Sequence, residues 1–412
     1  MRGAMTDTAR HGPARLSGAM TMMFAVAGGL SVANVYYAQP LLGAMAGDFG
    51  ISPASIGIVV TVTQIGYGLG LIFITPLGDI LDRRRLIAVQ SLLLCLALAA
   101  AALAPTGGLF MAAMVAVGLL SVLVQTLIAF AAVLAAPAAR GRTLGIVTSG
   151  VVIGILCARF IAGLLSDMGG WRSVYLTSAM LTLLMAIALH RILPDHRESQ
   201  PTPSYWSLLR SIPVLFIEEP VLRRKAVMAF LIFAVFSIFW TSLALPLRAE
   251  PHSMSHTAIG LFGLAGVAGA LAASWAGRLA DRGLGNWTTG ISLGLLLVSW
   301  ALISMLHTSI LALIAGTVLL DLAIQAVHVT NQSAILSIRP EAKSRIIGGY
   351  MVFYSAGSAS GAIASTAIYA HAGWAGVCLL GSAVSLAAVI YWAATLPRRK
   401  SLPRSVQTCP VC

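Results

Sequence analysis

The sequence predicts an all-α integral membrane protein with 12 transmembrane helices in two pseudo-symmetric halves. The first observation is composition, because 58% of the 412 residues are hydrophobic and only 9% are charged. A soluble protein of this length cannot bury so much apolar side chain, so the chain reads as a polytopic membrane protein. The second observation is a succession of 12 apolar segments, each near the ~20 residues that a bilayer requires. The third is repetition, because similar loops recur 202 or 203 positions apart.

The apolar segments and the polar stretches between them divide the chain into five parts. We expect an N-terminal tail, six spans, a linker, six further spans and a C-terminal tail at 1–16, 17–193, 194–224, 225–396 and 397–412. The first six spans are expected at 17–44, 54–78, 86–104, 109–136, 143–165 and 172–193. The other six are expected at 225–247, 257–280, 287–306, 309–337, 346–370 and 374–396. Within the linker, Tyr205 to Phe216 fits a helix lying flat on the membrane.

The distribution of basic residues predicts the orientation of the chain. With the N-terminus in the cytoplasm, 23 of the 26 Lys and Arg residues fall in cytoplasmic segments, leaving only Arg159, Arg172 and Arg248. Both termini are therefore expected in the cytoplasm. The net charge of +13 does not indicate a nucleic-acid partner, because the basic residues are spread among short loops. The expected partner is the lipid bilayer.

A charged loop follows one even-numbered span in each half. Leu77-Gly78-Asp79 precedes a run of three arginines, and Leu279-Ala280-Asp281-Arg282-Gly283 occupies the matching place. Such carboxylates can accept hydrogen bonds from the start of a neighbouring helix, while the arginines pair with acidic groups or lipid phosphates. The predicted cytoplasmic latch comprises Gly78, Asp79, Arg83, Arg84, Gly277, Asp281 and Arg282. Topology alone also produces charged loops, but two copies in register favour the latch.

On these loops the chain resembles the major facilitator superfamily, since Gly277-Arg278-Leu279-Ala280-Asp281-Arg282-Gly283 is similar to that superfamily's loop signature. The first copy departs from the signature at Thr75, Ile80 and Asp82. The resemblance implies two six-helix bundles around a central cavity, in a chain that functions as a monomer in a bacterial inner membrane. Spans 1, 4, 7 and 10 would line the cavity. Spans 2, 5, 8 and 11 would form the interface between the bundles, and the other four would support them.

Within the superfamily, the chain resembles bacterial drug and sugar efflux permeases. The likeness rests on Asn34-Val35-Tyr36-Tyr37-Ala38-Gln39-Pro40 in span 1 and on the run from Leu320 to Gln332 in span 10. Two motifs of proton antiporters are altered. Met114 stands where span 4 usually has an arginine, and Ala158-Arg159 replaces the usual Gly-Pro pair of span 5. These departures count against antiport by the usual arrangement.

Asp321 is the one acidic residue that falls in the middle of a predicted span, about 18 Å from its outer end at 1.5 Å per residue. A charge at that depth is costly unless it faces protein or water. Gln325, His328 and Asn331 follow on the same helical stripe. We interpret this stripe as a wall of the cavity and Asp321 with His328 as candidates for proton coupling. The alternative is a polar network that fixes helix packing.

Arg159 is the other charge in mid-membrane. We expect it to pair with Asp321 directly or through water, and we expect a proton or substrate to compete with that pair. The alternative is a side chain that reaches outward to the lipid headgroups.

Other polar and aromatic residues at similar depth suit a lining for organic solutes of mixed polarity. These substrate-cavity candidates are Asn34, Tyr37, Gln64, Gln125, Ser237, Trp240, Gln325, Asn331, Tyr350 and Tyr354. Packing is the alternative role for each. Two further aromatic residues, Tyr36 and Trp171, are interpreted as membrane-interface residues.

The function predicted from these features is secondary active transport of a small organic solute, coupled to protons and directed outward. Uptake by proton symport is the nearest alternative. No ATP-binding or redox motif is visible, so we expect no cofactor and no metal. A membrane-embedded enzyme would need clustered ligands or a nucleophile with a base, and a non-transporting sensor would need an added soluble domain. Neither feature is evident in the sequence.

Overall fold

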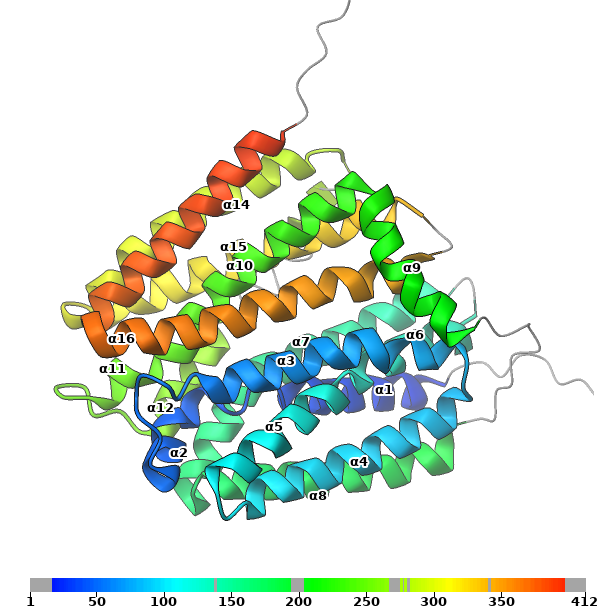
Figure 1. The fold of residues 1–412 in the computed structure, drawn as a ribbon, viewed down its shortest axis with the longest axis horizontal. Coiled ribbons are helices and arrows are strands. Elements are labelled where there is room, and N and C mark those ends of the chain that lie inside the picture. The colour runs from blue at the N-terminus through cyan, green and yellow to red at the C-terminus, as the bar shows by residue number, and fades with distance from the viewer. Residues whose placement is uncertain are drawn as a thin grey trace, which may run out of the picture.

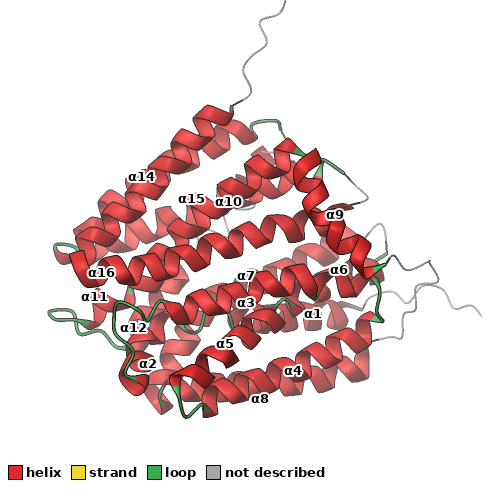
Figure 2. Cartoon of the chain, in the orientation of Figure 1, coloured by secondary structure: helices red, strands yellow, loops and turns green. Residues whose placement is uncertain are grey.

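The computed structural model describes residues 17–136, 139–193, 204–266, 275–276, 278–279, 282–339 and 342–396. Within these residues every regular element is a helix (Figure 2). The two tails, the first part of the linker, Gly277 and Asp281 lie outside the described residues. Most helices run roughly side by side along the long axis of the molecule (Figure 1).

The first half consists of eight α-helices and two short 3₁₀ helices. They are α1 (Gly18–Ala33), η1 (Gln39–Leu41), α2 (Leu42–Phe49), α3 (Ile58–Phe73), η2 (Thr75–Asp79), α4 (Arg83–Leu103), α5 (Gly107–Ser121), α6 (Leu123–Leu134), α7 (Arg140–Gly169) and α8 (Trp171–Ile192). The predicted first span is interrupted before Pro40, because proline lacks the N–H that would continue the helix. Side chains of Asp82 and Thr106 cap the starts of α4 and α5.

The second half follows the linker helix α9 (Tyr205–Glu218). The described elements are α10 (Pro220–Ser242), α11 (Ala244–Arg248), α12 (His256–Leu261), η3 (Phe262–Ala265), α14 (Gly285–Ile303), η4 (Ser304–His307), α15 (Ile310–Leu336) and α16 (Lys343–Thr395). The 53 residues of α16 contain two predicted spans, which meet at Gly373. Gly373 has φ of 60°, a left-handed conformation that glycine adopts readily, and the chain folds back there (Figure 1).

The predicted all-α membrane fold is confirmed. Among the described residues, nine helices are long and apolar enough to cross a membrane. The long helix α16 accounts for two predicted spans, while the predicted spans 17–44 and 257–280 correspond to the shorter α1 and α12 with their neighbouring segments. All 12 predicted segments therefore have a helical counterpart.

The two halves meet where α3 packs on α16 and where α7 packs on α12 and η3. These helices belong to spans 2, 11, 5 and 8, the set that the family resemblance assigned to the interface. Thr61 Oγ1 donates a hydrogen bond to the Ala359 carbonyl at 2.9 Å. At the same end of the molecule, Asp167 at the end of α7 accepts one from the backbone N–H of Thr257 at 2.8 Å. A carboxylate at a helix start stabilises the contact between the halves.

The linker helix α9 lies across the boundary between the halves. The Tyr205 hydroxyl donates to the Phe73 carbonyl at 2.9 Å, which ties α9 to the first half. Phe216 stacks on Phe353 of α16 with ring centroids 5.2 Å apart, which ties it to the second half. Figure 1 shows α9 beside the ends of α10 and α6. The sequence predicted a helix from Tyr205 to Phe216, and the helix extends two residues further.

Candidate functional site

Arg159 is the centre of a buried cluster between the halves. Its side chain, on α7, is 3% exposed. Nε donates a hydrogen bond to Gln39 Oε1 at 2.7 Å. The guanidinium carbon lies 3.9 Å from the ring centroid of Trp240, and 5.1 and 5.3 Å from those of Tyr36 and Phe236. Aromatic faces stabilise a desolvated cation, so the rings replace part of the hydration that burial removes.

Asp321 on α15 is also buried, with 5% of its surface exposed. The indole Nε1 of Trp240 donates a hydrogen bond to Asp321 Oδ1 at 3.1 Å. The same indole is the ring on which Arg159 stacks. We expect Arg159 and Asp321 to pair directly or through water; the direct form is not found, because the described ion pairs include none that joins the two residues. A neutral tryptophan contacts both the cation and the carboxylate.

A glycine provides the space for the Asp321 carboxylate. A Cβ atom placed on Gly266 would lie 3.1 Å from Asp321 Oδ2. The positions 203 residues earlier are Thr63 and Gly118, and there a Cβ on Gly118 would lie 1.9 Å from the Thr63 carbonyl oxygen. In the first half the glycine is at the position equivalent to Asp321, and in the second half it is at the position equivalent to Thr63. In the first half the two helices touch through backbone, and in the second a carboxylate fills the contact.

A second group of rings adjoins this cluster around His328. His328 Nδ1 and the Tyr350 hydroxyl are 2.9 Å apart. The imidazole also contacts Phe233 edge-on, at a centroid distance of 5.0 Å. Tyr354 packs on Phe233 at 4.0 Å, and its hydroxyl is hydrogen-bonded to that of Tyr36. The Arg159 cluster and the His328 group thus meet at two tyrosines, one from each half, whose hydroxyls are hydrogen-bonded to each other.

Several predicted cavity residues border this region. Ser355 of α16 donates to Gln64 Oε1 at 3.3 Å, across the two halves. Gln125 Nε2 donates to the Tyr67 hydroxyl at 3.4 Å. Ser237 pairs with Thr241 inside α10 at 3.4 Å. Gln325 is partly exposed on α15.

Three other candidates are also buried. Asn34 accepts a hydrogen bond from Ser178 of α8 at 2.6 Å, within the first half. Tyr37 is 4% exposed and belongs to the main hydrophobic core, which spans both halves. Asn331 is fully buried beside Tyr350. The structure brings Trp240, Asp321 and Arg159 into one cluster and places Asn34 outside it.

The first latch loop is held by its own arginines. Arg83 Nε donates to the Gly78 carbonyl at 2.8 Å, and Arg83 Nη2 lies 3.5 Å from Asp79 Oδ1. Arg84 Nη2 donates to the His190 carbonyl at the end of α8, at 2.7 Å. Of the second loop, Gly277 and Asp281 lie outside the described residues, and Arg282 is exposed.

The interpretation of Tyr36 and Trp171 as membrane-interface residues is wrong. Tyr36 is 3% exposed and contacts Arg159, while Trp171 is 4% exposed and donates to Asp48 Oδ2 at 2.8 Å. The sequence also missed Gln39. The available signal was spacing, because Tyr36 and Gln39 lie three residues apart and so on one helical face.

Little free space remains at the Arg159 cluster. The cavity bordered by Gln39, Arg159 and Trp240 has a volume of about 10 Å³. That is room for one water molecule at most. The structure therefore holds this part of the boundary between the halves in a closed arrangement.

Two helical halves that meet around buried charges are typical of a membrane transporter. The Major Facilitator Superfamily model matches residues 24–291 and 225–408. The chain belongs to the major facilitator superfamily. It is a membrane transporter and not an enzyme.

Related proteins cover nearly the whole chain. The transporter YgaY of Escherichia coli K12 is 45% identical over 377 residues, which is 92% of this chain and 95% of YgaY. The transporter SCO4007 of Streptomyces coelicolor is 36% identical over 403 residues, covering 95% and 92% of the two chains. The crystal structure of the nucleoside transporter NupG has a TM-score of 0.73 at 15% identity, covering 92% of this chain and 100% of NupG. That last similarity concerns the fold alone.

Proposed function

We propose that this transporter exports a small organic solute across the bacterial inner membrane in exchange for protons. The chain would work as two six-helix bundles, 17–193 and 225–396, joined by the linker at 194–224. The loops rich in arginine, and both tails, would face the cytoplasm, as the distribution of Lys and Arg favours. The contacts between the halves at Thr61 and Asp167 would then close the outer side.

The observation that carries the proposal is the hydrogen bond from Trp240 to buried Asp321. A carboxylate surrounded by protein in a membrane needs compensation, and here a neutral indole supplies one hydrogen bond while the cation stacks behind the ring. Protonation of Asp321 removes the charge that orients the indole. Trp240 is then free to turn, and Arg159 loses the ring on which it lies.

This sequence of events would couple proton binding to movement. Arg159 on α7 and Trp240 on α10 belong to different halves, so their contact stabilises the closed arrangement. Loosening it at Asp321 would favour separation of the halves. In this proposal the contacts that sense the proton also hold the two halves together. Proton binding can then favour one conformation over the other, because it acts differently on the two.

The side chains at the boundary between the halves favour a small organic substrate, but they do not identify which one. Tyr67, Phe233 and Tyr354 offer ring faces, while Gln64 and Gln125 offer amide groups at the same boundary. Such a mixture suits solutes of mixed polarity. Export is favoured over uptake by the resemblance to efflux permeases, and uptake by proton symport is the second candidate.

The test is transport in proteoliposomes with an imposed pH gradient. A panel of organic solutes is screened for movement, and proton flux is recorded with a pH-sensitive dye. Antiport predicts that protons and solute move in opposite directions, and co-directional flux would establish symport instead. Asp321→Asn should abolish coupled proton flux, while Glu250→Gln, which neutralises an exposed carboxylate, should not. Unchanged proton flux in Asp321→Asn would refute the role of this carboxylate.

A further inference from the structure

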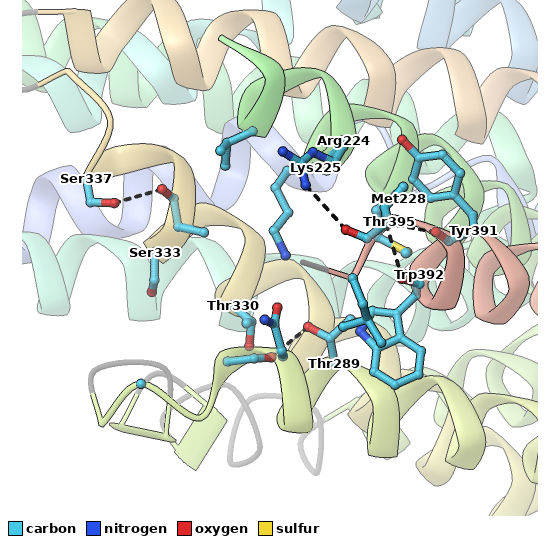
Figure 3. Close-up of a pocket in the computed structure, with 16 residues that line it drawn as sticks. Arg224, Lys225, Met228, Thr289, Thr330, Ser333, Ser337, Tyr391, Trp392 and Thr395 are labelled. Carbon is cyan, nitrogen blue, oxygen red and sulfur yellow. Dashed lines mark hydrogen bonds between the residues drawn. The ribbon is translucent and has the colours of Figure 1, made fainter. Parts of the chain in front are cut away.

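A second cavity lies within the second half, between α10, α14, α15 and the last turns of α16 (Figure 3). Its volume is about 630 Å³, which is in the range of small-molecule sites. Thr330, which lines it, is nine residues beyond Asp321, or about 13 Å further along the helix. The cavity is therefore separate from the Arg159 cluster.

Three of the polar residues that line this cavity, Arg224, Lys225 and Trp392, have side chains that only donate hydrogen bonds. In Figure 3 the side chain of Lys225 extends from α10 into the space, below Arg224. The structure gives Lys225 no ion-pair partner within the described residues. Within the part of the chain that the structure describes, Arg224 makes long hydrogen bonds to carbonyl oxygens, of 3.4 Å to Pro220 and 3.3 Å to Thr395.

A third donor lies buried in the wall of the same cavity. Trp392 lines the cavity, and its buried indole Nε1 has no hydrogen-bond partner in the described structure. A buried N–H without an acceptor costs about 1–3 kcal/mol, so an acceptor supplied by a ligand would be stabilising. None of the described lining residues is acidic. Two cations and an orphan N–H without a carboxylate among the described lining residues are chemically suited to an anion.

We propose that this cavity binds a phosphate group carried on a small organic body, as in the headgroup of an anionic phospholipid or a free glycerophosphate. Lys225 and Arg224 bind the phosphate oxygens, and the Trp392 indole donates to the same group or to its ester oxygen. The cavity is too large for phosphate alone, and its walls include Met228 and Leu396, which suit the carbon atoms of the ligand. Basic pockets between membrane helices favour such headgroups.

The experiment uses the full-length purified protein in detergent and native mass spectrometry. The probes are phosphatidylglycerol, phosphatidylcholine and sn-glycerol 3-phosphate. We expect phosphatidylglycerol to be retained in preference to phosphatidylcholine, and Lys225→Gln to weaken its binding about tenfold, the loss of one charge-assisted contact. Trp392→Phe keeps the ring, removes the N–H and should weaken binding about threefold. Arg210→Gln, which removes an exposed arginine of α9 outside the cavity, is the matched control and should change nothing.

Competition identifies the source of the phosphate. If sn-glycerol 3-phosphate displaces the lipid, the site takes soluble phosphate esters, and if it does not, the site takes the lipid headgroup. Both results support the site. Equal binding by Lys225→Gln and Arg210→Gln would overturn the proposal. So would the absence of any preference of the native protein for the two anionic probes over phosphatidylcholine, whose phosphate is neutralised by its own choline group. Should Lys225→Gln fail to fold, as judged by circular dichroism, Trp392→Phe carries the test alone.

Discussion

Trp240 and Asp321 form a buried hydrogen bond between α10 and α15, with indole Nε1 3.1 Å from the carboxylate oxygen. The face of the same indole ring contacts the Arg159 guanidinium, which belongs to the other half. One side chain thus contacts both membrane charges. Its two functions can be separated by substitution, because phenylalanine retains a ring face and lacks the N–H.

Trp240→Phe should impair transport less than Asp321→Asn does. The phenyl ring still supports Arg159, but Asp321 loses its donor, so we expect transport to fall about five- to tenfold, the effect of about 1–1.5 kcal/mol. Trp240→Leu removes the ring as well and should cost more. Initial rates of solute movement in proteoliposomes measure this. In an Asp321→Asn background Trp240→Phe should add little, and additive losses would show that the hydrogen bond is not the functional link.

Gly266→Ala should disturb Asp321 directly. The added methyl group would lie 2.3 Å from Leu156 Cδ2 and 3.1 Å from Asp321 Oδ2. Overpacking of this kind costs about 1–3 kcal/mol, and we expect both the thermal midpoint and the transport rate to fall. Leu156→Ala in the same chain relieves the closest contact. It should restore the thermal midpoint without restoring transport, since the carboxylate stays displaced.

The control for this pair is Gly294→Ala in α14. A Cβ there meets nothing within 4 Å, and alanine favours a helix by about 1 kcal/mol. Gly294→Ala should therefore leave transport unchanged and stability equal or higher. If Gly266→Ala with Leu156→Ala transports normally, the position of the carboxylate does not depend on Gly266.

The helices could be predicted from the sequence, while the contacts at the site could not. Apolar length fixes the spans, and Pro40 and Gly373 interrupt them by local backbone chemistry. The 203-residue offset of the repeat relates Asp321 to Gly118. Their different neighbours, Gly266 and Thr63, became visible only when the packing was known.

The partners of Arg159 show why this limit exists. Its hydrogen bond to Gln39 joins residues 120 positions apart, and its rings come from both halves. No local pattern encodes such distant pairs. Tyr36 was misassigned for a related reason, because an aromatic residue near the end of a span suits the membrane interface and the protein core equally well.

Asp48 should make stability depend on pH. Hydrogen bonds from the Trp171 indole and then from Arg172 hold the pKa of the Asp48 carboxyl below its ordinary value of 3.8. Because the pKa is lower in the folded state, the Asp48 charge contributes fully to the free energy of unfolding above pH 3.8. That contribution is lost as pH falls through the folded-state pKa. Because 44% of the Asp48 side chain is exposed, we expect its charge to contribute less than about 1 kcal/mol to the free energy of unfolding.

The measurement is thermal unfolding of the native chain and of Asp48→Asn at pH 7 and near pH 3. The difference between the two should be largest at pH 7 and should shrink at the lower pH. Arg172→Gln removes one donor and should show the same trend with a smaller amplitude. A difference that is constant with pH would mean that Asp48 acts through packing and not through its charge.

Gly57 should control the balance between closed and open arrangements of the halves. A Cβ atom on Gly57 would lie 2.4 Å from the Ala362 carbonyl oxygen and 2.5 Å from Thr366 Oγ1, both on α16 of the other half. Gly57→Ala therefore forces α3 and α16 apart at the end where the halves meet. A cost of about 1–3 kcal/mol that falls on one state alone changes the ratio of the two states about 5- to 150-fold.

Spin labels at Ser52 and His371, which are exposed on the two halves, report this change by pulsed electron paramagnetic resonance. We expect Gly57→Ala to shift the distance distribution to longer values, because the closed state alone contains the tight contact. Gly47→Ala is the control, since a Cβ there meets nothing within 4 Å. If Gly57→Ala lowers the thermal midpoint but leaves the distances unchanged, the contact between α3 and α16 stabilises both states equally, and the halves do not separate along this seam.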